Sequence, residues 1–123
     1  MKNIISWFEI PALDLRRATI FYEQILGVPM RQAVDMGVPM SFFPMREGEQ
    51  GVGGAIVQIA NVEPSKNGTL VYLNVEGRMR EVLERVPAAG GKILMTRTDA
   101  GDPGFIATIE DTEGNRIGLH SST

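Results

Sequence analysis

Residues 7–27 read WFEIPALDLRRATIFYEQILG, and they predict a strand followed directly by a helix. The strand is indicated by a run of β-branched and aromatic residues over positions 4–10. Asp14 then offers a carboxylate to the free N–H groups of a first helical turn, and Gly27 suits the left-handed conformation at a helix end. Between them, apolar residues recur at helical spacing, at Ala18, Phe21, Tyr22 and Ile25.

The same order returns in the second half of the chain. Residues 69–75, TLVYLNV, predict another strand, and Gly90 ends the helical segment that follows it. Pro87 is expected to end or bend the last turn of that helix. The helical spacing is carried by Met79, Val82, Leu83 and Val86, 61 residues after its first occurrence at Ala18. An offset of half the chain indicates an internal duplication.

Each helix is followed by three more strand-like runs. They lie at 29–36, 38–45 and 53–60 in the first half, and at 91–98, 104–111 and 115–121 in the second. The Pro-, Gly- and Asn-containing segment 61–68 is the expected linker. We therefore predict one α+β domain over residues 1–123, with two tandem βαβββ modules at about 1–62 and 68–123 that form a curved mixed sheet around a cavity. GVGG, residues 51–54, is expected to form a turn with a bulge, because no helix follows it.

Composition excludes several classes of site and partner. The chain has no cysteine, so a disulfide, a thiolate metal site and a cysteine nucleophile are ruled out. Its net charge is −3 and it has no cluster of basic residues, so nucleic acid is not an expected partner. No apolar run approaches the roughly 20 residues that span a membrane. With no leader-like pattern, we expect a cytoplasmic protein. The exposed edges of each half-sheet predict a homodimer.

Four motifs, in this order, carry a resemblance to a known superfamily. They are EIPALDLRRATIFYEQILGV, GVGGAIV, AAGGKIL and IEDTEGNRIGLHS. Together with the duplicated order, they resemble the vicinal oxygen chelate superfamily of glyoxalase I, extradiol dioxygenases and bleomycin-resistance proteins. The chain is most similar to the small type described as predicted enzymes related to lactoylglutathione lyase. The resemblance implies a small-molecule ligand in the cavity, often bound over a divalent metal.

The resemblance also implies where metal ligands would lie, usually as His or Glu. The implied positions are Trp7, Leu70, Gly118 and either Ile56 or Gln58. The side chains of tryptophan, leucine and glycine cannot ligate a divalent ion, and a catalytic site needs about three protein ligands. We therefore expect neither a metal nor another cofactor.

Strand alternation extends these positions to a candidate site. If Trp7 faces the cavity, Glu9 does too, and Tyr72, Asn74 and His120 follow from Leu70 and Gly118. The candidate catalytic residues are Glu9, Tyr72 and His120. The candidate ligand-binding residues are Trp7, Gln58, Leu70, Asn74, Met40, Phe43 and Phe105, with Met36 and Met45 as further walls.

Several of these residues also have a purely structural interpretation. Trp7 can fill space in a shrunken pocket, and Tyr72 can be a core residue. Glu9 can form a structural ion pair with Arg116 or Arg31, because an unpaired buried charge is costly. The sequence leaves both interpretations open.

Four functional classes follow. The first is a metal-free protein that binds a small, partly apolar compound. The second is a metal-independent lyase or isomerase with Glu9 as general base, assisted by Tyr72 or His120, although His120 can equally be a hydrogen-bonding structural residue. The third is a divalent-metal lyase or dioxygenase, against which the substituted ligand positions count. The fourth is a degenerate domain that acts through protein contacts. Whether the halves pair within one chain or swap between chains stays open.

Overall fold

The computed structural model describes residues 3–45 and 51–123. The first module contains β1 (Trp7–Pro11), α1 (Leu15–Leu26), β2 (Arg31–Asp35), β3 (Val38–Phe42) and β4 (Gly53–Val57). The second contains β5 (Tyr72–Asn74), α2 (Met79–Ala88), β6 (Lys92–Asp99), β7 (Phe105–Glu110) and β8 (Arg116–Ser121). The predicted α+β class and the tandem βαβββ order are confirmed.

Helix α1 begins and ends at the residues that its sequence indicates. The Asp14 side chain accepts a hydrogen bond from the Arg17 backbone N–H at 3.1 Å, which caps the first turn. Gly27 follows the last turn with φ at 67°, a left-handed conformation, and its N–H donates to the Glu23 carbonyl. In α2, Pro87 lies in the last turn and the helix ends one residue later, at Ala88.

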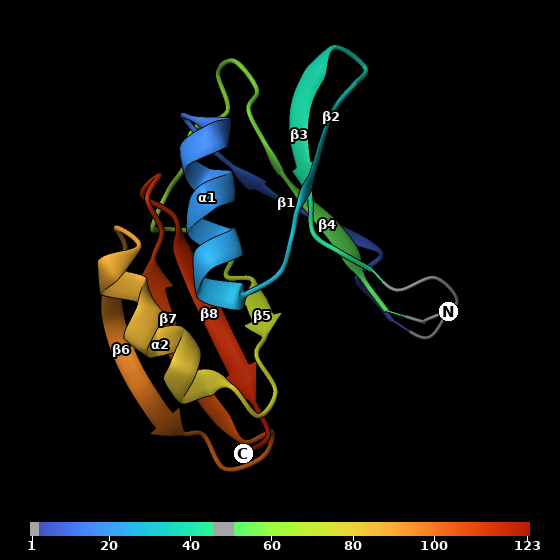
Figure 1. Cartoon of the computed structure of the whole chain (residues 1–123). Coiled ribbons are helices and arrows are strands. Elements are labelled where there is room, and N and C mark those ends of the chain that lie inside the picture. Colours follow the sequence, from blue (N-terminus) through green and yellow to red (C-terminus); the bar gives the residue numbers. More distant parts are fainter. Residues whose placement is uncertain (1–2, 46–50) are drawn as a thin grey trace.

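Each module builds its own four-stranded sheet. The strand orders are β1-β4-β3-β2 and β5-β8-β7-β6, with the first strand of each module parallel to the last and the other pairs antiparallel. Among the described residues the two sheets share no paired strands, so the predicted curved sheet consists of two four-stranded halves and is not a closed barrel. Figure 1 shows the reason: α1 and α2 lie side by side, and the first sheet extends away from the second.

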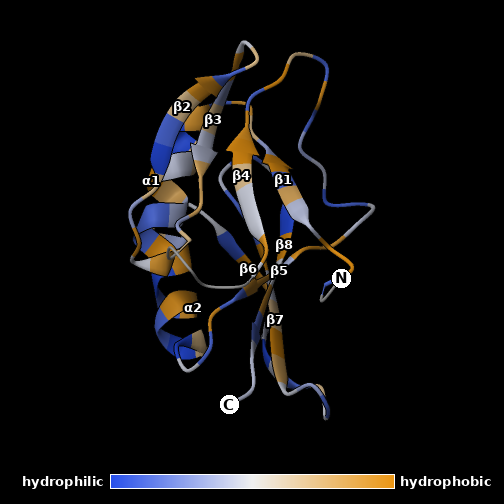
Figure 2. Ribbon diagram, turned by 90° about the vertical axis from the view of Figure 1, so that its right-hand side faces the viewer, coloured by the Kyte–Doolittle hydropathy of each residue, from blue (hydrophilic) through white to orange (hydrophobic). Residues whose placement is uncertain are grey.

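The main core lies between the helices and the helix-facing sides of both sheets. In Figure 2 both helices lie on the left, with β1, β4 and β7 to their right. Both modules contribute to one buried cluster, which includes Ile10, Phe21, Tyr22, Ile25, Ile56, Leu73, Val82, Val86, Ile109 and Leu119. The helix-free side of each sheet is therefore left outside this core.

The glycine pair of β4 lies inside a strand rather than in the predicted turn. Gly53 and Gly54 pair with Trp7 and Phe8 of β1, and residues 46–50 of the preceding connection lie outside the described residues. A Cβ on Gly54 would lie 2.2 Å from the Phe8 ring, and one on Gly53 would lie 2.9 Å from Trp7 Cζ3. Gly54 thus makes room for the Phe8 ring, and Gly53, on the opposite face of the strand, makes room for the Met45 side chain and the Trp7 ring.

Candidate functional site

The helix-free face of the first sheet carries the first group of candidate residues. Ile10 and Ile56 are buried toward α1, so alternation places Trp7 and Glu9 on the opposite face. Trp7 is 44% exposed, and its indole N–H donates to Glu9 Oε2 at 3.2 Å. Met40 lies on the same face, in a small separate cluster with Ala55 and Val57. The predicted neighbours Trp7 and Glu9 are therefore in direct contact.

Aromatic and charged groups continue across this face. The rings of Trp7 and Phe42 lie 6.1 Å apart between centroids, and the Arg31 guanidinium lies 4.5 Å from the Phe42 centroid. The strand register runs from Glu9 through Ala55 and Phe42 to Arg31. Glu9 and Arg31 thus occupy opposite edges of the sheet, too far apart for the ion pair considered from the sequence.

The helix-free face of the second sheet has a matching arrangement at its β5 edge. Tyr72 pairs with Gly118, and a Cβ on Gly118 would lie 2.4 Å from Tyr72 Cδ1. Tyr72 is 46% exposed. Asn74 pairs with His120 on the same face, and the His120 ring contacts the Pro103 carbonyl oxygen at 3.1 Å. Arg116, the other partner considered for Glu9, belongs to this second sheet.

Three predicted pocket residues lie elsewhere and contribute to the helix side. Phe43 packs against Phe8 in a tilted contact and against Tyr22 edge-on, with centroids 5.5 and 5.6 Å apart, and Phe105 packs against the main core. The carbonyl oxygen of the Gln58 side chain accepts the Leu15 N–H at 2.8 Å and so caps α1.

The physical reason is strand parity, because a shift of one residue moves a side chain to the other face. Phe43 is three positions after Met40, and an odd separation along a strand places two side chains on opposite faces. Ile56, the alternative to Gln58 as the second metal position, is fully buried toward α1. Leu70 lies half-buried just before β5.

The residues at the implied metal positions do not fit a divalent ion. Trp7, Leu70 and Gly118 have no ligating side-chain atom. Across residues 3–45 and 51–123, no group of three or more His, Cys, Asp or Glu side chains is placed to hold a metal. No chemical step is therefore assigned to a metal at these positions.

A shallow groove lies away from both helix-free faces. It has a volume of about 270 Å³ and is lined by Asp14, Arg16, Arg17, Ile20, Phe21, Ala89 and Thr112. These residues come from α1 and its N-cap, the end of α2 and the turn before β8. The groove is thus a feature of the junction between modules.

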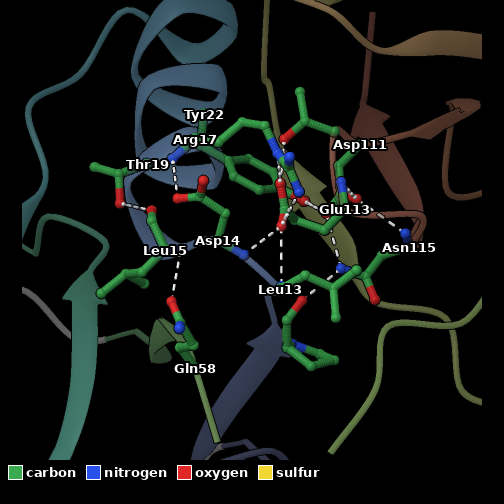
Figure 3. A network of polar contacts seen from close by, with 12 residues as sticks. Leu13, Asp14, Leu15, Arg17, Thr19, Tyr22, Gln58, Asp111, Glu113 and Asn115 are labelled. Carbon is green, nitrogen blue, oxygen red and sulfur yellow. Dashed lines mark hydrogen bonds and ion pairs between the residues drawn. The ribbon is translucent and has the colours of Figure 1, made fainter.

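A buried polar network at this junction was not predicted from the sequence. Glu113, whose side chain is fully buried, accepts the backbone N–H groups of Leu13 and Asp14 at 2.9 and 2.8 Å. It also accepts two hydrogen bonds from the Arg17 guanidinium, at 2.8 and 3.0 Å (Figure 3). The turn that precedes β8 in the second module therefore caps the first helix of the first module.

The rest of the network fixes the same turn. Asp111 accepts the buried Tyr22 hydroxyl at 2.6 Å, and Asn115 donates to the Pro11 carbonyl at 2.7 Å. Burial raises the pKa of Tyr22 well above its ordinary value, and the nearby Asp111 raises it further. Burial alone would raise the pKa of Glu113, but hydrogen bonds from Arg17, Asp14 and Thr112 outweigh it and lower that pKa.

The other end of α1 is also held by the second module. The guanidinium groups of Arg78 and Arg85 donate to the carbonyls of Leu26 and Ile25, at 2.6 and 3.3 Å. These are carbonyls of the last helical turn, which have no partner within the helix, and a cation is favourable beside them. Both ends of α1 are thus bound by groups from the second half of the chain.

Neither helix in the described part of the chain has the length and apolar content needed to cross a bilayer.

Comparison with known proteins agrees with this architecture. A curated relative from Didymella fabae, described as a glyoxylase-like domain-containing protein, is 31% identical and aligns with 90% of this chain and 88% of its own. A solved structure of a glyoxalase-related enzyme from Fulvimarina pelagi has a TM-score of 0.69 at 17% identity, and covers 98% of this chain and 88% of that one.

A second solved structure, a glyoxalase/bleomycin resistance protein from Albidiferax ferrireducens, has a TM-score of 0.71 at 16% identity and covers 97% of this chain and 98% of that one. At such identities these structures establish the fold. The family model described as Glyoxalase/Bleomycin resistance protein/Dioxygenase superfamily matches residues 4–119. The chain belongs to this superfamily.

Proposed function

We propose that the protein binds a small, partly apolar compound, without a metal, in a cavity that two copies of the chain build together. In this arrangement the helix-free face of the first sheet of one copy lies opposite the helix-free face of the second sheet of the other. The observation that carries the proposal is the half-exposure of Trp7 and Tyr72, each on the edge strand of a sheet face that the described residues leave without a covering helix.

The contacts within the chain support a second copy as the cover. Helices α1 and α2 pack on each other, and Glu113, Arg78 and Arg85 bind both ends of α1 to the second module. The two helix-free faces of one chain therefore cannot turn toward each other without breaking this junction. In the described part of the chain, edge strands β1 and β5 each pair with a single neighbour, which leaves a row of backbone groups for a partner.

The chemistry of the faces supports a small-molecule ligand. Trp7, Phe42 and Met40 supply apolar walls, and Glu9 and Asn74 add polar groups, a combination that ligand sites share. A metal-independent enzyme is the second candidate, because Glu9 lies beside the indole on such a wall and a carboxylate can act as a general base. Turnover of a bound compound that is lost in Glu9→Gln would favour this second function.

A native mass spectrum of the purified protein tests the proposal. We expect the mass of a dimer to which more small molecule than metal ion is bound. A spectrum of monomers at micromolar concentration, or of dimers that each hold a stoichiometric divalent ion, would contradict it.

A further inference from the structure

From the two aromatic rings that lie over glycines, we infer that the ligand of this protein is a planar heteroaromatic cation. The inference rests on the proposed function, since it places Trp7 of one copy and Tyr72 of the other on two walls of one cavity. The ligand would stack between the two rings, with its positive charge beside Glu9.

The first step is the equivalence of the two rings. Each belongs to the first strand of its module, and each pairs in parallel register with a glycine of the last strand, Trp7 with Gly53 and Tyr72 with Gly118. The two modules are related by duplication, so equivalent positions lie on opposite walls when a first module faces a second one. The rings then form a pair of platforms.

The second step is the role of the glycines. Neither Gly53 nor Gly118 has a left-handed backbone, so neither is needed for its conformational freedom. Each instead leaves the space of its missing side chain to its neighbours. A Cβ on Gly118 would lie 2.4 Å from the Tyr72 ring, and one on Gly53 would lie 2.6 Å from Met45 Sδ and 2.9 Å from the Trp7 ring. The rings are thus held against the sheet, while nearly half of each residue stays exposed. A flat ligand is the shape that such a pair of surfaces accepts.

The third step is charge. The indole N–H of Trp7 donates to Glu9 at 3.2 Å, which holds the carboxylate at the edge of the ring. Aromatic faces attract cations, most strongly in tryptophan, and the carboxylate adds to that attraction. At the opposite edge of the same sheet face, the Arg31 guanidinium already lies over the Phe42 ring, 4.5 Å from its centroid. The positive charge of a ligand is therefore expected beside Glu9, at the β1 edge of this face.

The test compares three compounds with the dimeric wild-type protein by isothermal titration calorimetry. N-methylquinolinium is planar and cationic, quinoline at pH 8 is planar and neutral, and N-methylquinuclidinium is cationic but not planar. We expect saturable binding of N-methylquinolinium, with roughly tenfold weaker binding of each of the other two. Trp7 is the only tryptophan, so its emission should saturate along the same curve. Free N-acetyltryptophanamide controls for collisional quenching.

Variants of the platform decide which contacts are used. Glu9→Gln removes the charge but keeps an oxygen that can accept the indole N–H, and it should weaken N-methylquinolinium binding roughly tenfold without changing quinoline binding. Gly118→Ala should displace the Tyr72 ring and weaken both planar compounds. Should either of these two variants fail to fold, the other and the three-compound comparison still decide the matter.

Two results would overturn the inference. One is equal binding of N-methylquinuclidinium and N-methylquinolinium, and the other is a dimer that binds none of the three compounds. In both cases the two-copy cavity of the proposed function stands. A monomeric protein would instead contradict the proposed function itself.

Discussion

Glu113 of the second module accepts a bidentate hydrogen bond from Arg17 of α1, at 2.8 and 3.0 Å, while the same carboxylate caps the start of that helix. The pair joins residues that are 96 positions apart in the chain. Together with Arg78 at the opposite end of α1, it makes the first helix a shared element of both modules. The orientation of the modules, and with it the exposure of the two helix-free faces, depends on these contacts.

Replacement of Glu113 by Gln should destabilise the protein by about 1.5–3 kcal/mol. The N–H groups that donate to the two carboxylate oxygens of Glu113 would be left with the single acceptor oxygen of the amide. Urea unfolding measures the change. Glu110→Gln is the matched control: its carboxylate pairs with the largely exposed Lys66, and such pairs contribute little. Equal stability of Glu113→Gln and wild type would show that the junction does not depend on this carboxylate.

Stability should fall in acid through the same residue. The folded-state pKa of Glu113 is lowered, so its contribution is complete above the unfolded-state pKa of about 4.3 and is lost as the pH falls through the lower folded-state value. Between pH 6 and 3, the melting temperature of the wild type should therefore decline more steeply than that of Glu113→Gln. Parallel curves of melting temperature against pH for the two proteins would show that Glu113 does not cause the acid sensitivity.

The Arg78 side chain should stabilise the C-terminal end of α1. Arg78→Met removes a charged donor to the Leu26 carbonyl but keeps most of the aliphatic stem, and we expect a loss of about 0.5–1.5 kcal/mol. Arg80→Met, an exposed position two residues further on in α2, should change the stability little. Thermal unfolding of both variants provides the comparison, and an equal loss in the two would argue against a specific cap.

Gly54 is required for the space that Phe8 occupies. Gly54→Ala places a Cβ 2.2 Å from that ring, which is packed against Phe43, and overpacking of this kind costs about 1–3 kcal/mol. Gly51→Ala meets no atom of residues 3–45 and 51–123 within 4 Å and serves as the control. Chemical denaturation of the two variants should separate them, and similar midpoints would mean that Phe8 moves aside freely.

Local sequence signals predicted most of the fold, because the residues that give these signals also form the helix ends and the apolar helix faces. Asp14 and Gly27 bound α1 as expected, and the duplicated spacing gave both modules. The arrangement of the modules could not be predicted, because it depends on contacts such as Glu113 with Leu13, between positions with no shared periodicity. The motif EDTEGN suggested a turn, but nothing in it identifies the helix that its glutamate caps.

The candidate site divides in the same way. Alternation from Trp7, Leu70 and Gly118 predicted the side of the sheet on which Glu9, Tyr72, Asn74 and His120 lie, and all four are on the helix-free faces. Residues chosen by type alone, such as Phe43 and Phe105, lie on the helix side, because a large apolar side chain fits a core as well as a pocket. Which residues contact a ligand stays a prediction.

The most direct test of the two-copy cavity is a cross-link between its two proposed walls. The chain has no cysteine, so Trp7→Cys and Tyr72→Cys can be coexpressed as separate chains and treated with a short bismaleimide. We predict a covalent dimer when both variants are present, and none when either is expressed alone. If the doubly substituted chain instead gives an internally cross-linked monomer, the two faces meet within one chain and the account is contradicted.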